Sequence, residues 1–392
     1  MIHIGFHLHA YQPPTQRREV LDRIFQESYL PVIEVLENND SAHLSLDIAR
    51  SLGERLSVNF LDRIRALYNA GKIELVNTPA YHYLLPFVPD HILLRQLQLN
   101  EQFYQQYFMG PDDYLFGVFP PELACSPHTA DSIKNAHYSW MMCDDEPCLF
   151  GRRHLSEHFR APLNYIPLHN KTKMLLRSRM WSNHISHMRE YSDGARFVRD
   201  LIEGQYQWSR AAGVDSDTYC ILAVDFETFG HHHTNAIERF LIPFFKEIKK
   251  RDKECHLSTL TQISLIFLKQ PVDNIFPQGS WSTSHADIAR YIHYPLWNNP
   301  DNTFHRLWNE FMQLAFSAAE RTDTESNPEL TYLLDTAFYS CTPWQYSHGN
   351  YEIASWCLPA FSRIVDLLCP DRKSSRLYEL WREMYLLFPR YT

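Results

Sequence analysis

The chain has 392 residues, of which 45% are hydrophobic and 21% charged, and this composition excludes a largely disordered or fibrous protein. Its formal net charge of -9 argues against nucleic acid or an anionic membrane surface as the main partner, because phosphate groups are bound by clusters of Lys and Arg. The sequence has no signal-peptide pattern, no CxxC pair and no apolar run of the roughly 20 residues that a membrane span needs, so we expect a cytoplasmic protein with reduced thiols.

Short apolar runs rich in β-forming residues recur along the first two thirds of the chain, with helix-period segments between most of them. The strand candidates are residues 2–9, 43–48, 72–77, 114–119, 138–145, 173–178 and 219–226. The clearest helical segments between them are residues 18–38, 60–71 and 91–108. This alternation predicts a parallel sheet, which would either close into a barrel or form a doubly wound layer.

Polar residues at the C-terminal ends of these strands favour the barrel. They are His7, His9, Asp47, Glu74, Asn77, Glu122, Asp144, Asp145, Arg177, Arg179, Asp225 and Glu227. In a parallel barrel these strand ends share one face, so residues that are remote in sequence converge there. Two carboxylates about a hundred positions apart can then meet.

After about residue 268 the pattern changes. Residues 279–302 contain turn formers and aromatic residues without periodicity, which is typical of a long structured loop. Four helices are predicted after it, at about 303–321, 328–340, 351–369 and 373–387. The predicted domains are a barrel at 1–268, an aromatic-rich loop closing it at 269–302, and a C-terminal helical bundle at 303–392.

Two acidic residues stand out because of the runs that they follow. Glu122 comes directly after Pro120 and Pro121, which end strand pairing and fix φ, so a stiff backbone would hold the carboxylate. Asp225 and Glu227 end an apolar run at alternating positions, which places both acids on one side of the strand. The simpler alternative to a functional role is a surface position in a stiff loop for Glu122, and a helix N-cap after the strand for Asp225 and Glu227. Two carboxylates among aromatic residues are also the minimum apparatus for cleaving a glycosidic bond.

Histidines suggest a competing hypothesis, a divalent metal site. His154 and His158 are spaced i, i+4, and His231, His232 and His233 follow Asp225. Neither cluster has the HExxH signature, and a chain with 21 histidines produces such spacings by chance. We therefore predict no metal and no cofactor.

Five segments, in this order, resemble the conserved regions of glycoside hydrolase family 57. They are HAYQPP, GKIELV, GVFPPELACSP, VDFETFGHH and an aromatic-rich Ser-Cys-x-x-Trp segment near the C-terminus, and they span residues 3 to about 360. The resemblance implies an incomplete barrel of seven parallel strands followed by a helical region. It also implies α-glucan substrates, since the family contains α-amylases, 4-α-glucanotransferases, branching enzymes and amylopullulanases that act with retention.

The resemblance also implies roles for single residues. Glu122 matches the catalytic nucleophile of the third region, and Asp225 matches the general acid/base of the fourth. The expected substrate-binding residues are His9, Gln12, Glu74, Phe119, Glu227 and Trp344, with Trp281 and Trp297 as further stacking platforms at the rim. The chain departs from the family pattern at Tyr11, where a second histidine is usual, at Phe119, where many members have tryptophan, and at Thr342 and Pro343, where some members have Asn-Asp.

The resulting prediction is a retaining enzyme whose partner is an α-glucan oligosaccharide or polysaccharide. Glu122 attacks the anomeric carbon while Asp225 protonates the leaving oxygen, and Asp225 then activates water. Retention requires the two carboxyl groups to lie about 5 to 5.5 Å apart. Three alternatives stay open: a 4-α-glucanotransferase or branching enzyme on the same fold, a metal-dependent polysaccharide deacetylase on a related barrel, and a glucan-binding protein without catalysis.

Overall fold

The computed structural model describes residues 1–149, 163–271, 278–322, 327–369, 371 and 375–389. Within this part of the chain, ten strands form one sheet. They are β1 (Ile2–Ala10), β2 (Leu44–Ile48), β3 (Ile73–Leu75), β4 (Gly117–Val118), β5 (Trp140–Asp144), β6 (Tyr165–His169), β7 (Thr172–Arg177), β8 (Thr218–Asp225), β9 (Cys255–Ser258) and β10 (Leu268–Pro271).

Seven of these strands run parallel around an incomplete barrel, in the order β3-β2-β1-β8-β7-β5-β4. Strand pairing in the barrel is sparse at two places. A single bridge, from Asn77 to Val118, links the segment that follows β3 with strand β4, and a single residue pair, Arg177 with Ile221, links β7 with β8. All seven predicted strands are present. The predicted fold class, an incomplete (β/α)7 barrel followed by C-terminal helices, is therefore confirmed.

Three further strands escaped the sequence prediction. β6 forms an antiparallel hairpin with β7, β9 pairs with the first half of β1, and β10 pairs with β6 at the edge of the sheet. All four residues of β10 are exposed, so this strand lacks the apolar pattern that marks a buried one. These strands enlarge the sheet at the end away from the polar strand ends.

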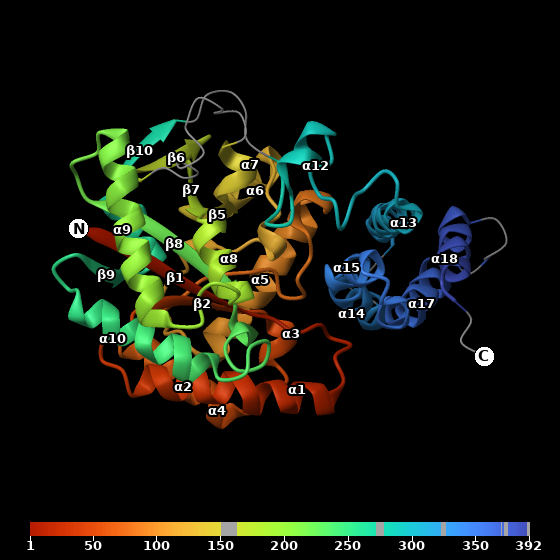
Figure 1. The fold of residues 1–392 in the computed structure, drawn as a ribbon. Coiled ribbons are helices and arrows are strands. Elements are labelled where there is room, and N and C mark those ends of the chain that lie inside the picture. Colours follow the sequence, from red (N-terminus) through yellow and green to blue (C-terminus); the bar gives the residue numbers. More distant parts are fainter. Residues whose placement is uncertain (150–162, 272–277, 323–326, 370, 372–374, 390–392) are drawn as a thin grey trace.

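The helices pack outside the barrel and form a second group beyond it (Figure 1). The first group comprises α1 (Arg18–Ile24), α2 (Leu30–Glu37), α3 (Arg50–Gly53), α4 (Val58–Asn69), α5 (Asp90–Tyr107), α6 (Pro127–Asn135), α7 (Asp145–Leu149), α8 (Arg179–His187), α9 (Gly194–Ala212), α10 (Ile242–Lys250) and α11 (Leu260–Ile266). After α12 (His285–Ala289), the second group comprises α13 (Thr303–Ala319), α14 (Pro328–Thr336), α15 (Cys341–Ser347), α16 (Tyr351–Ala354), α17 (Leu358–Leu368) and α18 (Arg376–Leu387). Among the described helices, none has the length and apolarity to cross a membrane.

Strand β1 shows how the barrel positions polar groups. All nine of its residues are buried, and successive side chains point to opposite faces of the sheet. Phe6 and Leu8 belong to the core that the outer helices cover. His7 and His9 point the other way, and each stacks on Phe119 inside the barrel. The alternation of apolar residues and histidines in the sequence thus marks an interior lined by imidazoles.

The C-terminal helices pack directly on the barrel. One apolar cluster joins Met141 and Met174, from β5 and β7, to Phe311, Phe338 and Phe361 of the helical region. A shared core of this kind fixes the position of both parts relative to each other. Side chains from α15 and its surroundings can therefore form part of a site at the barrel mouth. The predicted division into three domains at residues 268 and 302 stays a prediction.

Candidate active site

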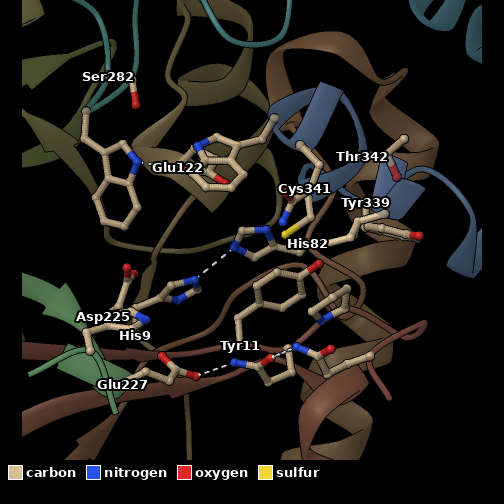
Figure 2. A pocket seen from close by; sticks show the side chains of 18 of the residues that line it. His9, Tyr11, His82, Glu122, Asp225, Glu227, Ser282, Tyr339, Cys341 and Thr342 are labelled. Carbon is tan, nitrogen blue, oxygen red and sulfur yellow. Dashed lines mark hydrogen bonds between the residues drawn. The ribbon is translucent and has the colours of Figure 1, made fainter. Parts of the chain in front are cut away.

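A cavity of about 570 Å³ lies at the C-terminal ends of the barrel strands (Figure 2). Its lining contains Glu122, Asp225 and Glu227, three carboxylates from two distant segments of the chain. The lining also includes His9, Gln12, His82, Arg177, His232, Trp281, Tyr339, Cys341, Trp344 and Trp356. The convergence predicted for the barrel strand ends therefore occurs, and the helical region contributes to the same cavity.

The backbone at Glu122 is strained. Strand β4 ends before Pro120, and residues Pro121–Leu123 form a single 3-10 turn. Glu122 and Leu123 both have positive φ, at 60° and 48°, a conformation that costs a non-glycine residue about 1 kcal/mol or more. The amide of Trp281 donates to the Glu122 carbonyl at 3.0 Å and helps to hold this geometry. Strain held in this way at a charged residue is typical of a functional position.

The carboxylate of Glu122 accepts a hydrogen bond at each oxygen. Trp281 Nε1 donates to Oε2 and Ser340 Oγ donates to Oε1, both at 2.9 Å. Burial raises the pKa of Glu122 to about 7, with the charge of Asp225 adding to the rise and the two donors and His9 opposing it. At pH above about 7 the two donors therefore meet an ionised, fixed carboxylate, as a nucleophile requires.

Asp225 is the last residue of β8 and lies beside His9 in the strand register. Its side chain is only partly buried, and none of the described residues donates a hydrogen bond to its carboxylate. Glu122 is thus engaged by protein donors while Asp225 is left open to the cavity. A carboxyl group that must pass a proton to a ligand and take one back needs this accessibility.

His9 lies between two acidic strands. The register pairs it with Asp47 of β2 on one side and with Asp225 of β8 on the other, and its Nδ1 lies 2.9 Å from Asp47 Oδ2. Burial alone would lower the pKa of His9, but Asp47, with Asp225 and Glu227, raises this pKa to about 9. A cationic imidazole therefore lies beside the two proposed catalytic carboxylates.

Glu227 is a second buried carboxylate in the cavity. Gln12 Nε2 donates to its Oε1 at 2.8 Å, and the hydroxyl of Tyr29 donates to the same oxygen. Burial and the charge of Asp225 raise the pKa of Glu227 to about 7, although both donors act against the rise. Gln12 and Glu227 thus form one bonded pair on the cavity wall, at the positions that the sequence predicted for substrate contacts.

The raised pKa of Glu227 predicts a pH-dependent stability difference. The folded pKa, about 7, lies above the ordinary value of 4.5, so the wild type loses stability as the pH rises from about 4.5 to 7. Glu227→Gln keeps the acceptor for Gln12 and Tyr29 but removes the buried charge. We expect this variant to be more stable than the wild type by about 1 to 3 kcal/mol at pH 8 and equally stable at pH 4.

Urea unfolding at both pH values measures this difference. Glu238→Gln, at an exposed position, is the matched control and should change stability at neither pH. Equal stability of Glu227→Gln and wild type at pH 8 would show that burial of this charge has no net cost.

Gly230 holds the loop that follows β8 close to the segment that carries Tyr29. Its φ is 101°, and a Cβ added to it would lie 1.8 Å from the carbonyl oxygen of Glu27. We expect Gly230→Ala to destabilise the protein by about 2 to 4 kcal/mol, since backbone strain and a backbone clash add. Gly213→Ala is the control, because Gly213 also has positive φ but has no atom within 4 Å of the added Cβ. Thermal unfolding of both variants checks the prediction, and equal losses would contradict it.

Aromatic side chains form part of the cavity wall. Trp281, Trp344 and Trp356 line it, and the guanidinium of Arg17 lies 5.1 Å from the ring centre of Trp356. Flat apolar faces of this kind suit the faces of sugar rings. Trp281 and Trp344 were predicted from the sequence, whereas Trp356 lies in a helical stretch that gave no such signal.

Glu74 does not line the cavity, contrary to the predicted sugar contact. Its carboxylate accepts hydrogen bonds from Ser45 Oγ at 2.6 Å and from the backbone amide of Leu260 at 2.9 Å, at the start of α11. An acid at this place satisfies amides that the helix leaves unpaired. Glu74 therefore joins β2 and β3 to α11, and we do not include it in the proposed site.

Phe119 and Trp297 also lie outside the cavity wall. Phe119 is fully buried and stacks on His9, with 4.4 Å between ring centres, so it packs against the His9 ring without lining the cavity. Trp297 is fully buried as well, and its Nε1 donates to the carbonyl of Ser340 at 3.0 Å. Both aromatic residues brace residues near Glu122, and neither presents a face to the cavity for stacking.

The second histidine cluster disperses in the structure. His231 Nδ1 contacts Glu27 at 2.6 Å, His233 Nε2 contacts the carbonyl of Ser186 at 2.7 Å, and only His232 lines the cavity. Among the described residues, no group of three or more His, Cys, Asp or Glu side chains is arranged to hold a metal ion. His154 and His158 lie outside the described residues.

Sequence reasoning missed several residues of the site. The most important are His82 and Ser340, which connect Glu122 to His9 through hydrogen bonds. His82 belongs to no predicted element and to no motif, and Ser340, which ends the helix predicted at 328–340, was not singled out as a site residue. One signal was available, since Ser340 directly precedes the Cys-x-x-Trp segment, which suggests that this stretch reaches the barrel mouth.

A family model described as glycosyl hydrolase family 57 matches residues 6–273. The alpha-amylase 1 of Dictyoglomus thermophilum is 24% identical over 188 residues, which is 45% of this chain and 27% of the relative. The 4-alpha-glucanotransferase of Thermococcus kodakarensis is 22% identical over 340 residues, which is 79% of this chain and 48% of the relative. The chain thus spans less than half the length of these curated relatives.

Solved structures show the same fold. A GH57-type branching enzyme from Pyrococcus horikoshii matches with a TM-score of 0.74 and 16% identity, covering 98% of this chain and 94% of that chain. The alpha-amylase AmyC from Thermotoga maritima matches with a TM-score of 0.63 and 14% identity, covering 99% and 97%. These similarities extend over the barrel and the C-terminal helices together.

Proposed function

This chain belongs to glycosyl hydrolase family 57, and we propose that it cleaves α-glucans by double displacement. Glu122 is the nucleophile and Asp225 is the general acid/base of this proposal. The observation that carries it is the contrast between the two carboxylates, because Glu122 is held by two donors while Asp225 is left open to the same cavity. A fixed nucleophile and an accessible proton carrier are the two parts that the reaction needs.

The first step forms a glycosyl-enzyme ester. An oxygen of the Glu122 carboxylate bonds to the anomeric carbon as the bond from that carbon to the leaving oxygen breaks, and the proton of Asp225 passes to the leaving oxygen. In the second step Asp225 takes a proton from water, and the water oxygen replaces Glu122 on the anomeric carbon. Each step inverts the anomeric carbon, so the product retains the configuration of the substrate.

The cavity wall supplies candidates for sugar binding. Gln12 and Glu227 present polar atoms, and Trp281, Trp344 and Trp356 present aromatic surface. We assign the sugar hydroxyls to the polar pair and the ring faces to the tryptophans. His9, at its raised pKa, stabilises negative charge on the carboxylates beside it.

Transfer to a sugar hydroxyl in place of water is the second candidate. Similarity to a 4-alpha-glucanotransferase and to a branching enzyme favours it, as do Trp344 and Trp356, whose rings offer a surface for an acceptor sugar. The outcome depends on how well a bound acceptor excludes water from the ester.

Incubation with maltoheptaose, followed by chromatography of the products, tests the proposal. Products shorter than the substrate indicate hydrolysis, and additional products longer than it indicate transfer. The Glu122→Gln variant should give neither. Products that appear equally fast with the variant, or no products from the wild type on maltoheptaose, amylose or glycogen, would contradict the proposed function.

A further inference from the structure

A continuous chain of hydrogen bonds runs from a buried aspartate to the proposed nucleophile. Asp47 Oδ2 lies 2.9 Å from His9 Nδ1. His9 Nε2 lies 2.9 Å from His82 Nε2, and Figure 2 shows this second contact as a dashed line. His82 Nδ1 then lies 2.7 Å from Ser340 Oγ, which donates to Glu122 Oε1 at 2.9 Å. The four side chains from Asp47 to Ser340 are all buried. Four bonds thus connect two carboxylates through two imidazole rings and a hydroxyl.

The charge of Glu122 sets the direction of the three hydrogen bonds between it and His9. An ionised Glu122 only accepts, so Ser340 donates to it and must accept from His82 Nδ1–H. A neutral His82 with its proton on Nδ1 has a bare Nε2, which accepts from His9 Nε2–H. Since His9 Nδ1–H also donates to Asp47, His9 is then the imidazolium. With Glu122 ionised, all four hydrogen bonds therefore form only when His9 carries one positive charge.

When Glu122 is protonated and His9 is neutral, the three hydrogen bonds between them run in the opposite direction. The total number of protons in the hydrogen-bond chain is the same. To reach this state, the His9 Nε2–H bond breaks as the His82 Nε2–H bond forms, and the His82 Nδ1–H bond breaks as a new Ser340 O–H bond forms. The original Ser340 O–H bond breaks as the Glu122 O–H bond forms. One proton has then effectively moved from His9 to Glu122 without exchange with water. The two end groups therefore share a single proton.

His82 and Ser340, in the middle of the hydrogen-bond chain, are held in place by several other contacts. His82 has a φ of 59°, so it carries backbone strain of the kind found at Glu122. The amide of Ser340 donates to the carbonyl of His82 at 3.0 Å, and Tyr11 stacks on the His82 ring with 3.7 Å between centres. Trp297 fixes the Ser340 carbonyl. Strain at His82, kept by so many contacts outside the catalytic pair, calls for a functional explanation.

Other ionisable groups also face Glu122 and His9, the two groups that share the proton of the hydrogen-bond chain. Asp225, Cys341 and Tyr11 face Glu122, and Asp47, Asp225 and Glu227 face His9. The acids around His9 outweigh its burial and raise its pKa to about 9, whereas burial and the charge of His9 lower the pKa of His82. The shared proton is therefore stabilised at the His9 end, and Glu122 is left ionised.

We propose that His82 and Ser340 are positioning residues that couple the ionisation of Glu122 to the charge on His9, and so keep the nucleophile as a carboxylate in a buried site. This inference rests on the proposed role of Glu122. It gives two residues outside the catalytic pair a defined effect on catalysis, because a protonated Glu122 cannot attack the anomeric carbon. His82 exerts this effect without contacting Glu122 directly.

Direct titration of Glu122 without substrate tests the coupling. Protein labelled with ¹³C at the glutamate side-chain carboxyl carbon gives one resonance per glutamate, and the Glu122→Gln spectrum assigns the signal of interest. We expect His82→Leu and Ser340→Ala each to raise the pH at which Glu122 titrates by about 1, because each removes support for the charged form. His82→Gln should titrate like the wild type, since an amide can accept from His9 and donate to Ser340.

His82→Gln is a matched control, because it also loses the imidazole that Tyr11 stacks on. Thermal unfolding confirms that each variant is folded, and Ser340→Ala, which removes one oxygen atom, is informative even where His82→Leu is not folded. A Glu122 titration unchanged in both Ser340→Ala and a folded His82→Leu would overturn the inference. So would a shift in His82→Gln as large as that in His82→Leu. An inactive wild type with the expected titration shifts would contradict the proposed function but not the coupling.

Discussion

The Glu122→Gln variant is expected to lose turnover of α-glucans, with kcat/KM falling by at least about 10⁴-fold. The amide has nearly the shape of the carboxylate and can still accept from Ser340 or Trp281, so the fold should survive. It cannot form the glycosyl-enzyme ester, because an uncharged amide is a poor nucleophile. Initial rates of reducing-sugar release from maltoheptaose measure the loss, and circular dichroism checks the fold.

Glu227→Gln is the matched comparison, because Glu227 is another buried carboxylate of the cavity with a pKa raised to about 7. It should lose less activity than Glu122→Gln, since Glu227 is proposed to bind sugar and not to react. Azide added to Glu122→Ala should restore turnover and give a glycosyl azide of inverted configuration, because azide replaces the missing nucleophile. A larger loss of activity in Glu227→Gln than in Glu122→Gln would show that Glu122 is not the nucleophile.

Replacement of Asp225 by Asn is expected to lower kcat/KM on maltooligosaccharides by about 10² to 10⁴-fold, the range of general acid/base catalysis. The loss should be smaller on an aryl α-maltooligoside with a good leaving group, because that oxygen departs without a proton. Parallel assays of both substrates with the wild type and the variant give the two ratios. The partial exposure of Asp225 makes a large effect on folding unexpected.

Azide provides the control for this second assignment. With Asp225→Ala it should accelerate breakdown of the ester and give a glycosyl azide of retained configuration, because Glu122 has already inverted the carbon once. Equal losses on both substrates would show that Asp225 does not protonate the leaving group. An inverted azide product would show that Asp225 is the nucleophile.

The sequence was sufficient for features that depend on local pattern. The seven barrel strands were predicted because apolar runs recur with helix-period segments between most of them, and all seven strands form. Glu122 and Asp225 were recognised because each follows such a run, and parallel strands place those ends on one face. The structure brings both acids into one cavity, together with the predicted His9, Gln12 and Glu227.

What the sequence could not supply is the partner of each polar group. Glu74 occupies a motif position, but its carboxylate accepts a hydrogen bond from the backbone amide of Leu260, at the start of a helix 186 residues later. His82 and Ser340 are separated by 258 positions, and no local pattern predicts that a barrel loop and a segment before α15 will exchange hydrogen bonds. Phe119 was expected in the cavity wall because of its motif position and Trp297 because it is aromatic, whereas packing places both side chains behind the wall.

The anomeric configuration of the first product tests the central claim most directly. Proton NMR of maltoheptaose during the first minutes of cleavage separates the α and β anomers before mutarotation mixes them. Double displacement through Glu122 and Asp225 predicts that the α anomer appears first and that the β anomer grows later by mutarotation. If the β anomer appears first, the reaction inverts configuration, and Glu122 cannot be a nucleophile that forms a covalent ester.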